Sequence, residues 1–204
     1  MQGNLIGTQK DGTSALGNHS RGVFVINSSD NGVASNTIAF NSTQGVAIAS
    51  TGTTKGNLLA ANSIFSNSGL GIDLDDDGKT ANDGDDPNTP QVDPDSDTGP
   101  NDLQNFPVLT SAKTSKKGTT ITGKLNSTPN KFFVVQLFSN ASGDESQKFI
   151  GQTSVTTDDS GNATFTFKPS KKVGGGQKIT ATATDTSAQN TSEFSAAKKV
   201  VRKR

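Results

Sequence analysis

The chain has 204 residues and balances 19 Lys and Arg against 19 Asp and Glu, which excludes a strongly charged scaffold for nucleic acid or membranes as a whole-chain property. Only 29% of the residues are hydrophobic, whereas Gly, Ser, Thr and Asn make up 89 of the 204, so order must come largely from backbone ladders. The lack of Cys, Trp and Tyr, with a single His, excludes disulfide frameworks, thiolate chemistry and most zinc sites.

The first part of the chain, residues 1–76, repeats with a period of 26 residues. The pairs related by this offset are Asn31 and Asn57, Asn36 and Asn62, Asn41 and Asn67, Ile38 and Ile64, Gly45 and Gly71, Val46 and Ile72, and Ile48 and Leu74. Such a period, with β-branched stretches at 22–25 and 45–48, is typical of a coiled parallel sheet. We expect about three rungs, with Ile and Val inside and Asn amides hydrogen-bonded along the stack. The alternative is that Asn-rich turns recur through composition alone.

Residues 77–102 form an acidic connector. Eleven Asp and one Lys lie between residues 73 and 102, whereas residues 103–204 carry 15 bases and six acids. Four prolines in the connector exclude a regular helix or central strand there, so we place the domain boundary near residue 102.

Two runs around the connector place carboxylates at alternate positions, with a glycine just after them. The candidate metal ligands are Asp73, Asp75, Asp77, Asp93, Asp95 and Asp97. Calcium is the expected cation because it takes six to eight oxygen ligands in irregular geometry. Neither run is an EF-hand, because the closing Glu is missing from both. The alternatives are a solvated linker, a catalytic role, and attraction to the basic second part without any metal.

Residues 103–204 are predicted to form an Ig-like β-sandwich. The expected strands are 106–112, 119–125, 131–138, 148–155, 162–168, 177–185 and 193–201. Alternation places Ala163, Phe165 and Phe167 on the core face. An alternative interpretation makes Phe132, Phe133 and Phe138 a ligand platform, although the domain needs these rings for its core. The basic C-terminal segment 198–204 is read as a solvated sheet edge, with anionic polymer as an alternative partner and nucleic acid disfavoured for lack of interleaved aromatics.

Several segments resemble bacterial surface proteins that carry right-handed parallel β-helix repeats followed by an Ig-like β-sandwich domain. The segments are 3–8, 12–18, 69–74 and 99–109 for the helix and its junction, and 160–165, 179–185 and 190–195 for the sandwich. The resemblance implies an all-β protein at the cell surface or outside the cell. The chain departs from the family in lacking an export signal and in having room for few rungs, which suggests the C-terminal end of a longer helix.

The expected function is a non-enzymatic extracellular surface, adhesion or structural module, stabilised by calcium, that presents its surfaces to a polysaccharide or protein. We expect no nucleic-acid partner and no membrane span, but we expect end-to-end self-association through the open β-helix end. The alternative is a calcium-dependent polysaccharide lyase or glycoside hydrolase. An enzyme is disfavoured because alanines lie one period before Asp73 and Asp75, and we read Arg21 as a surface charge.

Overall fold

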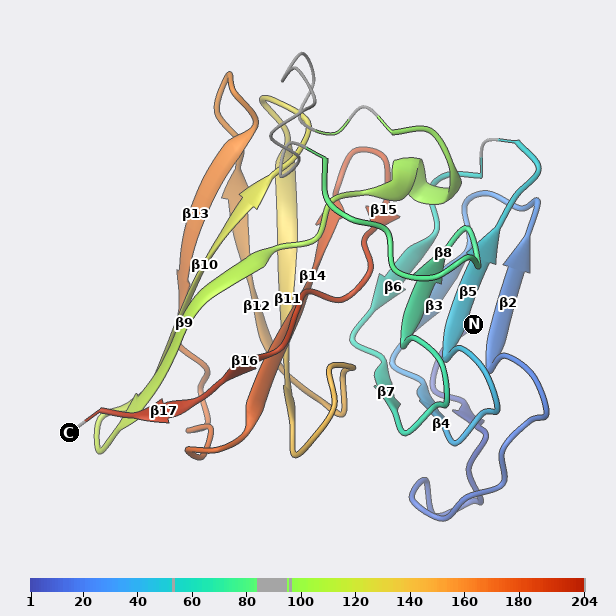
Figure 1. Cartoon of the computed structure of the whole chain (residues 1–204), viewed down its shortest axis with the longest axis horizontal. Helices are drawn as coiled ribbons and strands as arrows, with labels where there is room; N and C mark the ends of the chain where they lie inside the picture. The colour runs from blue at the N-terminus through green and yellow to red at the C-terminus, as the bar shows by residue number, and fades with distance from the viewer. Residues whose placement is uncertain (53, 84–94, 96, 204) are drawn as a thin grey trace.

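The computed structural model describes residues 1–52, 54–83, 95 and 97–203, and it is an all-β structure with a short 3₁₀ turn, η1 (Pro100–Leu103). Two bodies lie side by side (Figure 1). We call strands β1 to β8 the parallel unit and strands β9 to β17 the two-sheet unit. Within the described residues, no helix has the length and apolar character needed to cross a bilayer.

The parallel unit is built from short strands that the chain visits in a repeating order. They are β1 (Leu5–Ile6), β2 (Val23–Ile26), β3 (Gly32–Ala34), β4 (Thr37–Ala39), β5 (Val46–Ala49), β6 (Leu58–Ala60), β7 (Ser63–Phe65) and β8 (Ile72–Leu74). They form parallel sheets of order β1-β4-β7, β2-β5-β8 and β3-β6, so strands three apart along the chain lie side by side.

The predicted 26-residue offset is the pairing register of the later strands, where Ile38 lies opposite Ile64. The first pass does not keep this offset, since Leu5 pairs with Thr37. The departure follows from an excursion at residues 8–15, which an antiparallel bridge between its two ends closes. An insertion of this kind leaves the sheets intact, but it shifts residues 1–7 off the 26-residue offset, so a search for a fixed period does not detect them.

The corners share a pattern in which a residue with left-handed backbone precedes an asparagine. Ser35 and Ala61 have φ angles of 54° and 51°, and they precede Asn36 and Asn62. The other such corners are Phe40–Asn41 (φ 62° at Phe40) and Ser66–Asn67 (φ 56° at Ser66). Left-handed backbone costs a non-glycine residue about 1 kcal/mol or more, and the hydrogen bonds of the following asparagine offset this cost.

Three asparagine ladders run along the parallel unit. Their members are Asn4, Asn36 and Asn62; Asn18, Asn41 and Asn67; and Asn31, Asn57 and Asn101. In a typical step, the backbone N and Nδ2 of Asn36 each lie 3.0 Å from Oδ1 of Asn62. The predicted stacking of the 26-residue pairs is confirmed. Asn4, Asn18 and Asn101 were not expected, because they lie off that offset.

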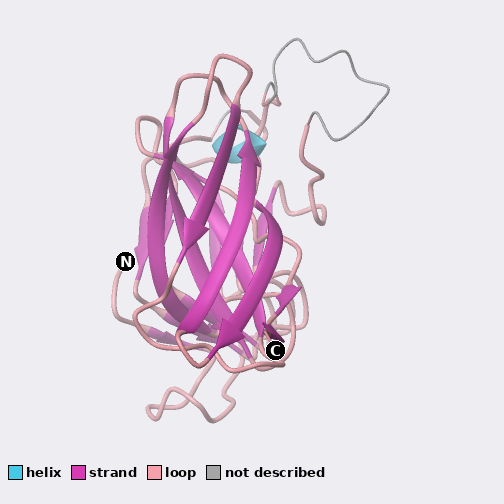
Figure 2. Cartoon of the chain, turned by 90° about the vertical axis from the view of Figure 1, so that its left-hand side faces the viewer, coloured by secondary structure: helices cyan, strands magenta, loops and turns pink. Residues whose placement is uncertain are grey.

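The two-sheet unit contains longer strands. They are β9 (Val108–Ser115), β10 (Gly118–Asn126), β11 (Phe132–Asn140), β12 (Lys148–Thr156), β13 (Asn162–Phe167), β14 (Lys178–Asp185), β15 (Asn190–Thr191), β16 (Lys198–Lys199) and β17 (Val201–Arg202). One sheet has the order β13-β10-β9-β17 and the other β12-β11-β14-β15, with β16 also paired to β14. Figure 2 views this unit from outside, where long strands cross its surface.

The first six strands predicted for this part are confirmed as β9 to β14, but the predicted strand 193–201 is wrong. Only its last third contains strands. Before them, the backbone N–H groups of Ser192 and Ser195 donate to carbonyls of β14, without a regular ladder. The reason is that Glu193 and Phe194 turn toward the parallel unit, which interrupts the alternation of a strand.

Strand β14 is buried on both faces. Ile179, Ala181 and Ala183 lie in the core between the sheets. Phe165 lies there too, as predicted, and Ala163 and Phe167 are partly buried against this core. The threonines that alternate with them are buried as well (Thr180, Thr182 and Thr184). This second face is covered because it packs against the parallel unit, so one sheet serves as the middle layer of the molecule.

The phenylalanines of the two-sheet unit have separate roles. Phe133 lies in the core between the sheets, whereas Phe138 and Phe194 join the core of the parallel unit. The last two rings meet edge to face, with centroids 5.6 Å apart. Phe132 is 50% exposed. Phe132, Phe133 and Phe138 therefore do not form one platform.

The two-sheet unit and η1 close one end of the parallel unit. Five backbone N–H groups of the last strands and their turns donate hydrogen bonds to side-chain oxygens of these covering elements. The pairs are Gly56 to Asn190, Asn57 to Asn101, Leu59 to Thr191, Ala61 to Gln136 and Leu74 to Glu193. These bonds satisfy donors that another strand would otherwise have to pair. At the opposite end, Leu5, Phe24 and Ile26 remain exposed.

Candidate functional site

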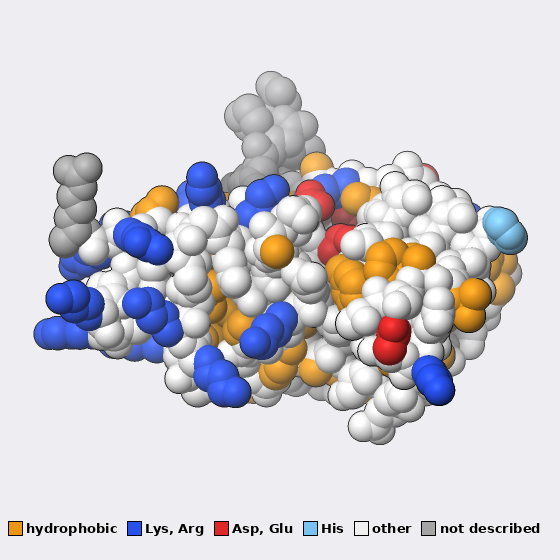
Figure 3. All heavy atoms as spheres, turned by 90° about the horizontal axis from the view of Figure 1, so that it is seen from below, with side chains coloured by type: hydrophobic (Ala, Val, Ile, Leu, Met, Phe, Trp, Pro, Cys, Tyr) orange, Lys and Arg blue, Asp and Glu red, His pale blue; other side chains and the backbone are white. Residues whose placement is uncertain are grey.

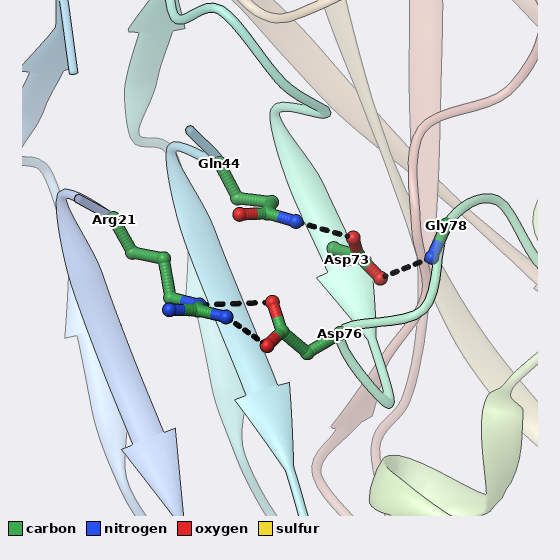
Figure 4. A network of polar contacts seen from close by, with 5 residues as sticks. All are labelled: Arg21, Gln44, Asp73, Asp76 and Gly78. Carbon is green, nitrogen blue, oxygen red and sulfur yellow. Dashed lines mark hydrogen bonds and ion pairs between the residues drawn. The ribbon is translucent and has the colours of Figure 1, made fainter. Parts of the chain in front are cut away.

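A polar network covers the outer face of the β2-β5-β8 sheet (Figure 4). In β8, Ile72 and Leu74 belong to the core, so the alternation of a strand turns Asp73 outward. Asp73 lies opposite Ala47, which in turn lies opposite Phe24. The network is therefore built over a row of one aromatic, one small and one acidic residue.

Asp73 is only 1% exposed although it faces outward. One carboxylate oxygen accepts a hydrogen bond from Nε2 of Gln44 at 2.9 Å, and the other accepts one from the backbone N of Gly78 at 3.3 Å. Burial raises the pKa of Asp73, and the nearby Asp76 and Asp77 carboxylates raise it further, whereas the two hydrogen bonds lower it. The carboxylate is thus held within the protein and does not face solvent.

Arg21 reaches across the middle strand to Asp76. Its Nε donates to Oδ1 of Asp76 at 2.9 Å, and its Nη2 contacts Oδ2, which makes the pair bidentate. The guanidinium carbon also lies 4.5 Å from the centroid of the Phe24 ring. Arg21 is a partly exposed surface charge, as expected, and it also links the segment before β2 to the segment after β8 through this ion pair.

A second group of carboxylates lies beside the start of the two-sheet unit. Asp95 accepts hydrogen bonds from Nε2 of Gln104 at 2.9 Å and from the hydroxyl of Ser127. Burial raises the pKa of Asp95 to about 7, and the charge of Asp83 adds to this shift. Burial also raises the pKa of Asp97 to about 6, with a further contribution from Asp83. The charge of Asp83 therefore acts on both Asp95 and Asp97.

The six predicted metal ligands are divided between these places. Asp73 belongs to the buried network, and Asp95 and Asp97 belong to the second group, whereas Asp75 and Asp77 are exposed. Asp93 lies outside the described residues. Among the residues that the structure does describe, no group of three or more His, Cys, Asp or Glu is arranged to hold a metal ion. Calcium binding stays a prediction.

Glu193 is a buried acid that the sequence did not single out. It is 3% exposed, and its two oxygens accept hydrogen bonds from the backbone N of Leu74 at 3.1 Å and of Thr80 at 3.3 Å. Burial raises its pKa to about 7; Asp73 adds to the shift and Lys79 opposes it. Glu193 thus joins the two units at the edge of the polar network.

We expect this burial to make stability fall as pH rises. Glu193 ionises near pH 4.5 when unfolded but near pH 7 when folded, so between these values the folded state holds more protons and the free energy of unfolding decreases with pH. The total loss is about 3 kcal/mol. Urea unfolding from pH 4 to 8 should therefore show that the free energy of unfolding changes less with pH in Glu193→Gln than in the unaltered chain. Equal slopes would contradict this account, since Asp95 contributes equally to both proteins.

Sequence reasoning missed the pairing of Arg21 with Asp76 and the contacts of Gln44, Asp83 and Glu193. Arg21 and Asp76 are 55 residues apart, and Leu74 and Glu193 are 119 apart. No spacing rule connects residues at such distances. Only the acidic composition near Asp76 and Asp83 pointed to this region.

Comparison with known proteins assigns no family to the chain. No protein-family model matches it, and no curated protein sequence matches it.

Proposed function

We propose that the chain is a non-enzymatic extracellular binding and structural module, in which a short right-handed parallel β-helix is closed by an Ig-like β-sandwich. The stacked parallel sheets and asparagine ladders support the first assignment, since both are typical of solenoids with a repeat of this length. The packing of one mainly antiparallel sheet on another supports the second.

The observation that carries the proposal is the closure of the last parallel strands by side chains of η1 and the two-sheet unit. Hydrogen bonds from backbone N–H groups to Asn101, Gln136, Asn190, Thr191 and Glu193 join the units, and Phe138 and Phe194 share the core of the first. A body joined in this way keeps its outer faces in fixed relative positions. Fixed faces suit the presentation of binding surfaces to a polysaccharide or protein partner.

Calcium is proposed to neutralise the crowded carboxylates around Asp83, Asp95 and Asp97. The charge of Asp83 raises the pKa of both Asp95 and Asp97, so a divalent cation beside them would relieve repulsion. Extracellular modules bind calcium weakly enough to require the concentrations found outside cells.

A thermal melt tests the calcium proposal. Calcium at 100 times its dissociation constant should add about 2.7 kcal/mol, or about 5–10 °C for a chain of this size. Magnesium should add less, and chelator should remove the shift. Asp95→Asn with Asp97→Asn should abolish the response, whereas Asp144→Asn with Asp159→Asn, which removes two exposed charges, should retain it. A melt that calcium does not change would leave the connector as a solvated linker.

Self-association is proposed only through the open end of the parallel unit. The other end is covered by the two-sheet unit, so copies cannot stack head to tail, but β1 and β2 of two copies can meet across a two-fold axis. Light scattering across a range of concentrations should then show a dimer and no longer chains.

The second candidate is a calcium-dependent polysaccharide lyase, favoured by the placement of Arg21 beside Asp73 and Asp76 on the outer face of a parallel sheet. Against it, Arg21 is already engaged by both oxygens of Asp76. Incubation with polygalacturonate and alginate decides between the two. Unsaturated product that absorbs in the ultraviolet, and that disappears in Asp73→Asn, would replace the proposed module with an enzyme.

A further inference from the structure

Lysines surround two large hollows of the two-sheet unit, which we call the basic hollows. The first has a volume of about 740 Å³, and its lining includes Lys148, Lys171 and Lys172 around the apolar Phe149, Ile150 and Val173. The second has a volume of about 570 Å³, and its lining includes Lys113, Lys117, Lys168 and Lys203. Figure 3 shows the basic side chains gathered over this half of the molecule, around a strip of apolar surface.

The positive charge of the basic hollows is not neutralised within the described part of the chain. No Asp or Glu lines either hollow, and none of their lysines forms an ion pair there. The ion pairs that do occur are Arg21–Asp76 and Lys55–Asp102, both involving lysine or arginine of the parallel unit. The basic hollows are therefore available to an anionic ligand.

The described connector carboxylate Asp95 lies too far from the second hollow to neutralise its lysines. Asp95 contacts Ser127, which follows the end of β10, whereas the second hollow contains Gly118 at the start of β10. At about 3.3 Å per residue, the length of β10 separates them by about 30 Å. This exceeds the Debye length of about 8 Å at physiological salt. Asp95 therefore does not neutralise the lysines of the second hollow, and attraction between the connector and the basic part stays a prediction.

The basic hollows adjoin each other through the segment between β13 and β14. Lys168 and Pro169 line the second hollow, and residues 170–173 line the first. All seven lysines belong to exposed positions. A single extended polymer can pass over this segment and contact lysines on both sides, which a compact anion cannot do.

The other lining groups favour a sugar polymer over a nucleic acid. They are neutral hydroxyl and amide side chains, among them Ser115, Thr120, Gln147 and Gln177, which match sugar hydroxyls. Phe149 is the one aromatic ring in the linings, and no arginine lines them. Nucleic-acid grooves rely on successive aromatic rings and on arginine forks.

We propose that the basic hollows bind an extended, acidic polysaccharide whose carboxylate or sulfate groups pair with the lysines while its apolar ring faces rest on Phe149. This inference rests on the proposed function as a module that presents binding surfaces, and it names the ligand class of one of them. It requires neither calcium nor the open end of the parallel unit.

Fluorescence anisotropy of a labelled oligogalacturonate, with chelator present, tests the inference. The triple variant Lys148→Gln, Lys171→Gln, Lys172→Gln should weaken binding about 10-fold or more, which corresponds to about 1.4 kcal/mol. The matched variant Lys10→Gln, Lys124→Gln, Lys131→Gln removes the same charge elsewhere and should change affinity less than about 3-fold. Binding should weaken between about 50 and about 200 mM salt.

Four results would overturn the inference. They are the absence of binding, equal losses in the two triple variants, equal binding of neutral dextran, and equal or tighter binding of duplex DNA or polyglutamate. The calcium melt and the lyase assay are independent of all four. Failure of polysaccharide binding is therefore distinguishable from failure of the proposed function.

Discussion

Replacing Phe194 by alanine should lower the free energy of unfolding by about 4 kcal/mol, the largest effect that we expect from one side chain. Phe194 is 6% exposed and belongs to the two-sheet unit along the chain, yet its ring lies in the core of the parallel unit against Phe138. The fit is close, because a Cβ added at Gly71 would lie 2.8 Å from the ring. The cavity left by the truncation would lie at the junction of the two units.

Urea unfolding followed by far-ultraviolet circular dichroism measures this loss. Phe132→Ala is the matched control, since Phe132 is 50% exposed and its truncation should cost less than about 1 kcal/mol. We also expect Phe194→Ala to separate the unfolding of the two units into distinct transitions. Similar midpoints for the two variants would show that the ring does not couple the units.

Asn62→Ala should destabilise the chain by about 3–4 kcal/mol because it leaves several buried groups without partners. Oδ1 of Asn62 accepts from the backbone N and from Nδ2 of Asn36, both at 3.0 Å, and its own Nδ2 donates to the carbonyl of Val33 at 2.7 Å. Asn62 and Asn36 are 3% and 1% exposed, so water does not readily replace these bonds.

The control for this variant is Asn162→Ala, which removes the same amide from an exposed pair. Nδ2 of Asn126 donates to Oδ1 of Asn162 at 2.9 Å, but solvent reaches this bond, so its loss should cost less than about 1 kcal/mol. Thermal melts of both variants measure the difference. If the two variants had the same melting temperature, the asparagine ladders would be a consequence of the fold and not a source of its stability.

These two predictions test one physical idea. The last strands of the parallel unit would otherwise carry unpaired backbone groups along one edge. The two-sheet unit covers this edge, because Phe138 and Phe194 enter the core of the parallel unit and side-chain oxygens of Gln136 and Thr191 accept hydrogen bonds from its last strands. Loss of these contacts should therefore lower the stability of the parallel unit more than that of the two-sheet unit.

Local pattern alone determined the all-β class, the 26-residue register and six strands of the second part. These features repeat at short, regular intervals, and alternation decides which face of a strand is buried. The asparagine at each corner was visible for the same reason. The predicted strand 193–201 was wrong because Glu193 and Phe194 contact the parallel unit. These contacts join residues distant in the chain, so local sequence patterns do not predict them.

Only the tertiary structure decided the contacts between distant residues. The Arg21–Asp76 pair, the burial of Glu193 and the gathering of lysines in each basic hollow all join residues that are far apart in the chain and share no fixed spacing. The sequence revealed that the second part is basic, but it could not reveal where that charge collects. The placement of a charge depends on which strands become neighbours, and that is settled by packing of the whole chain.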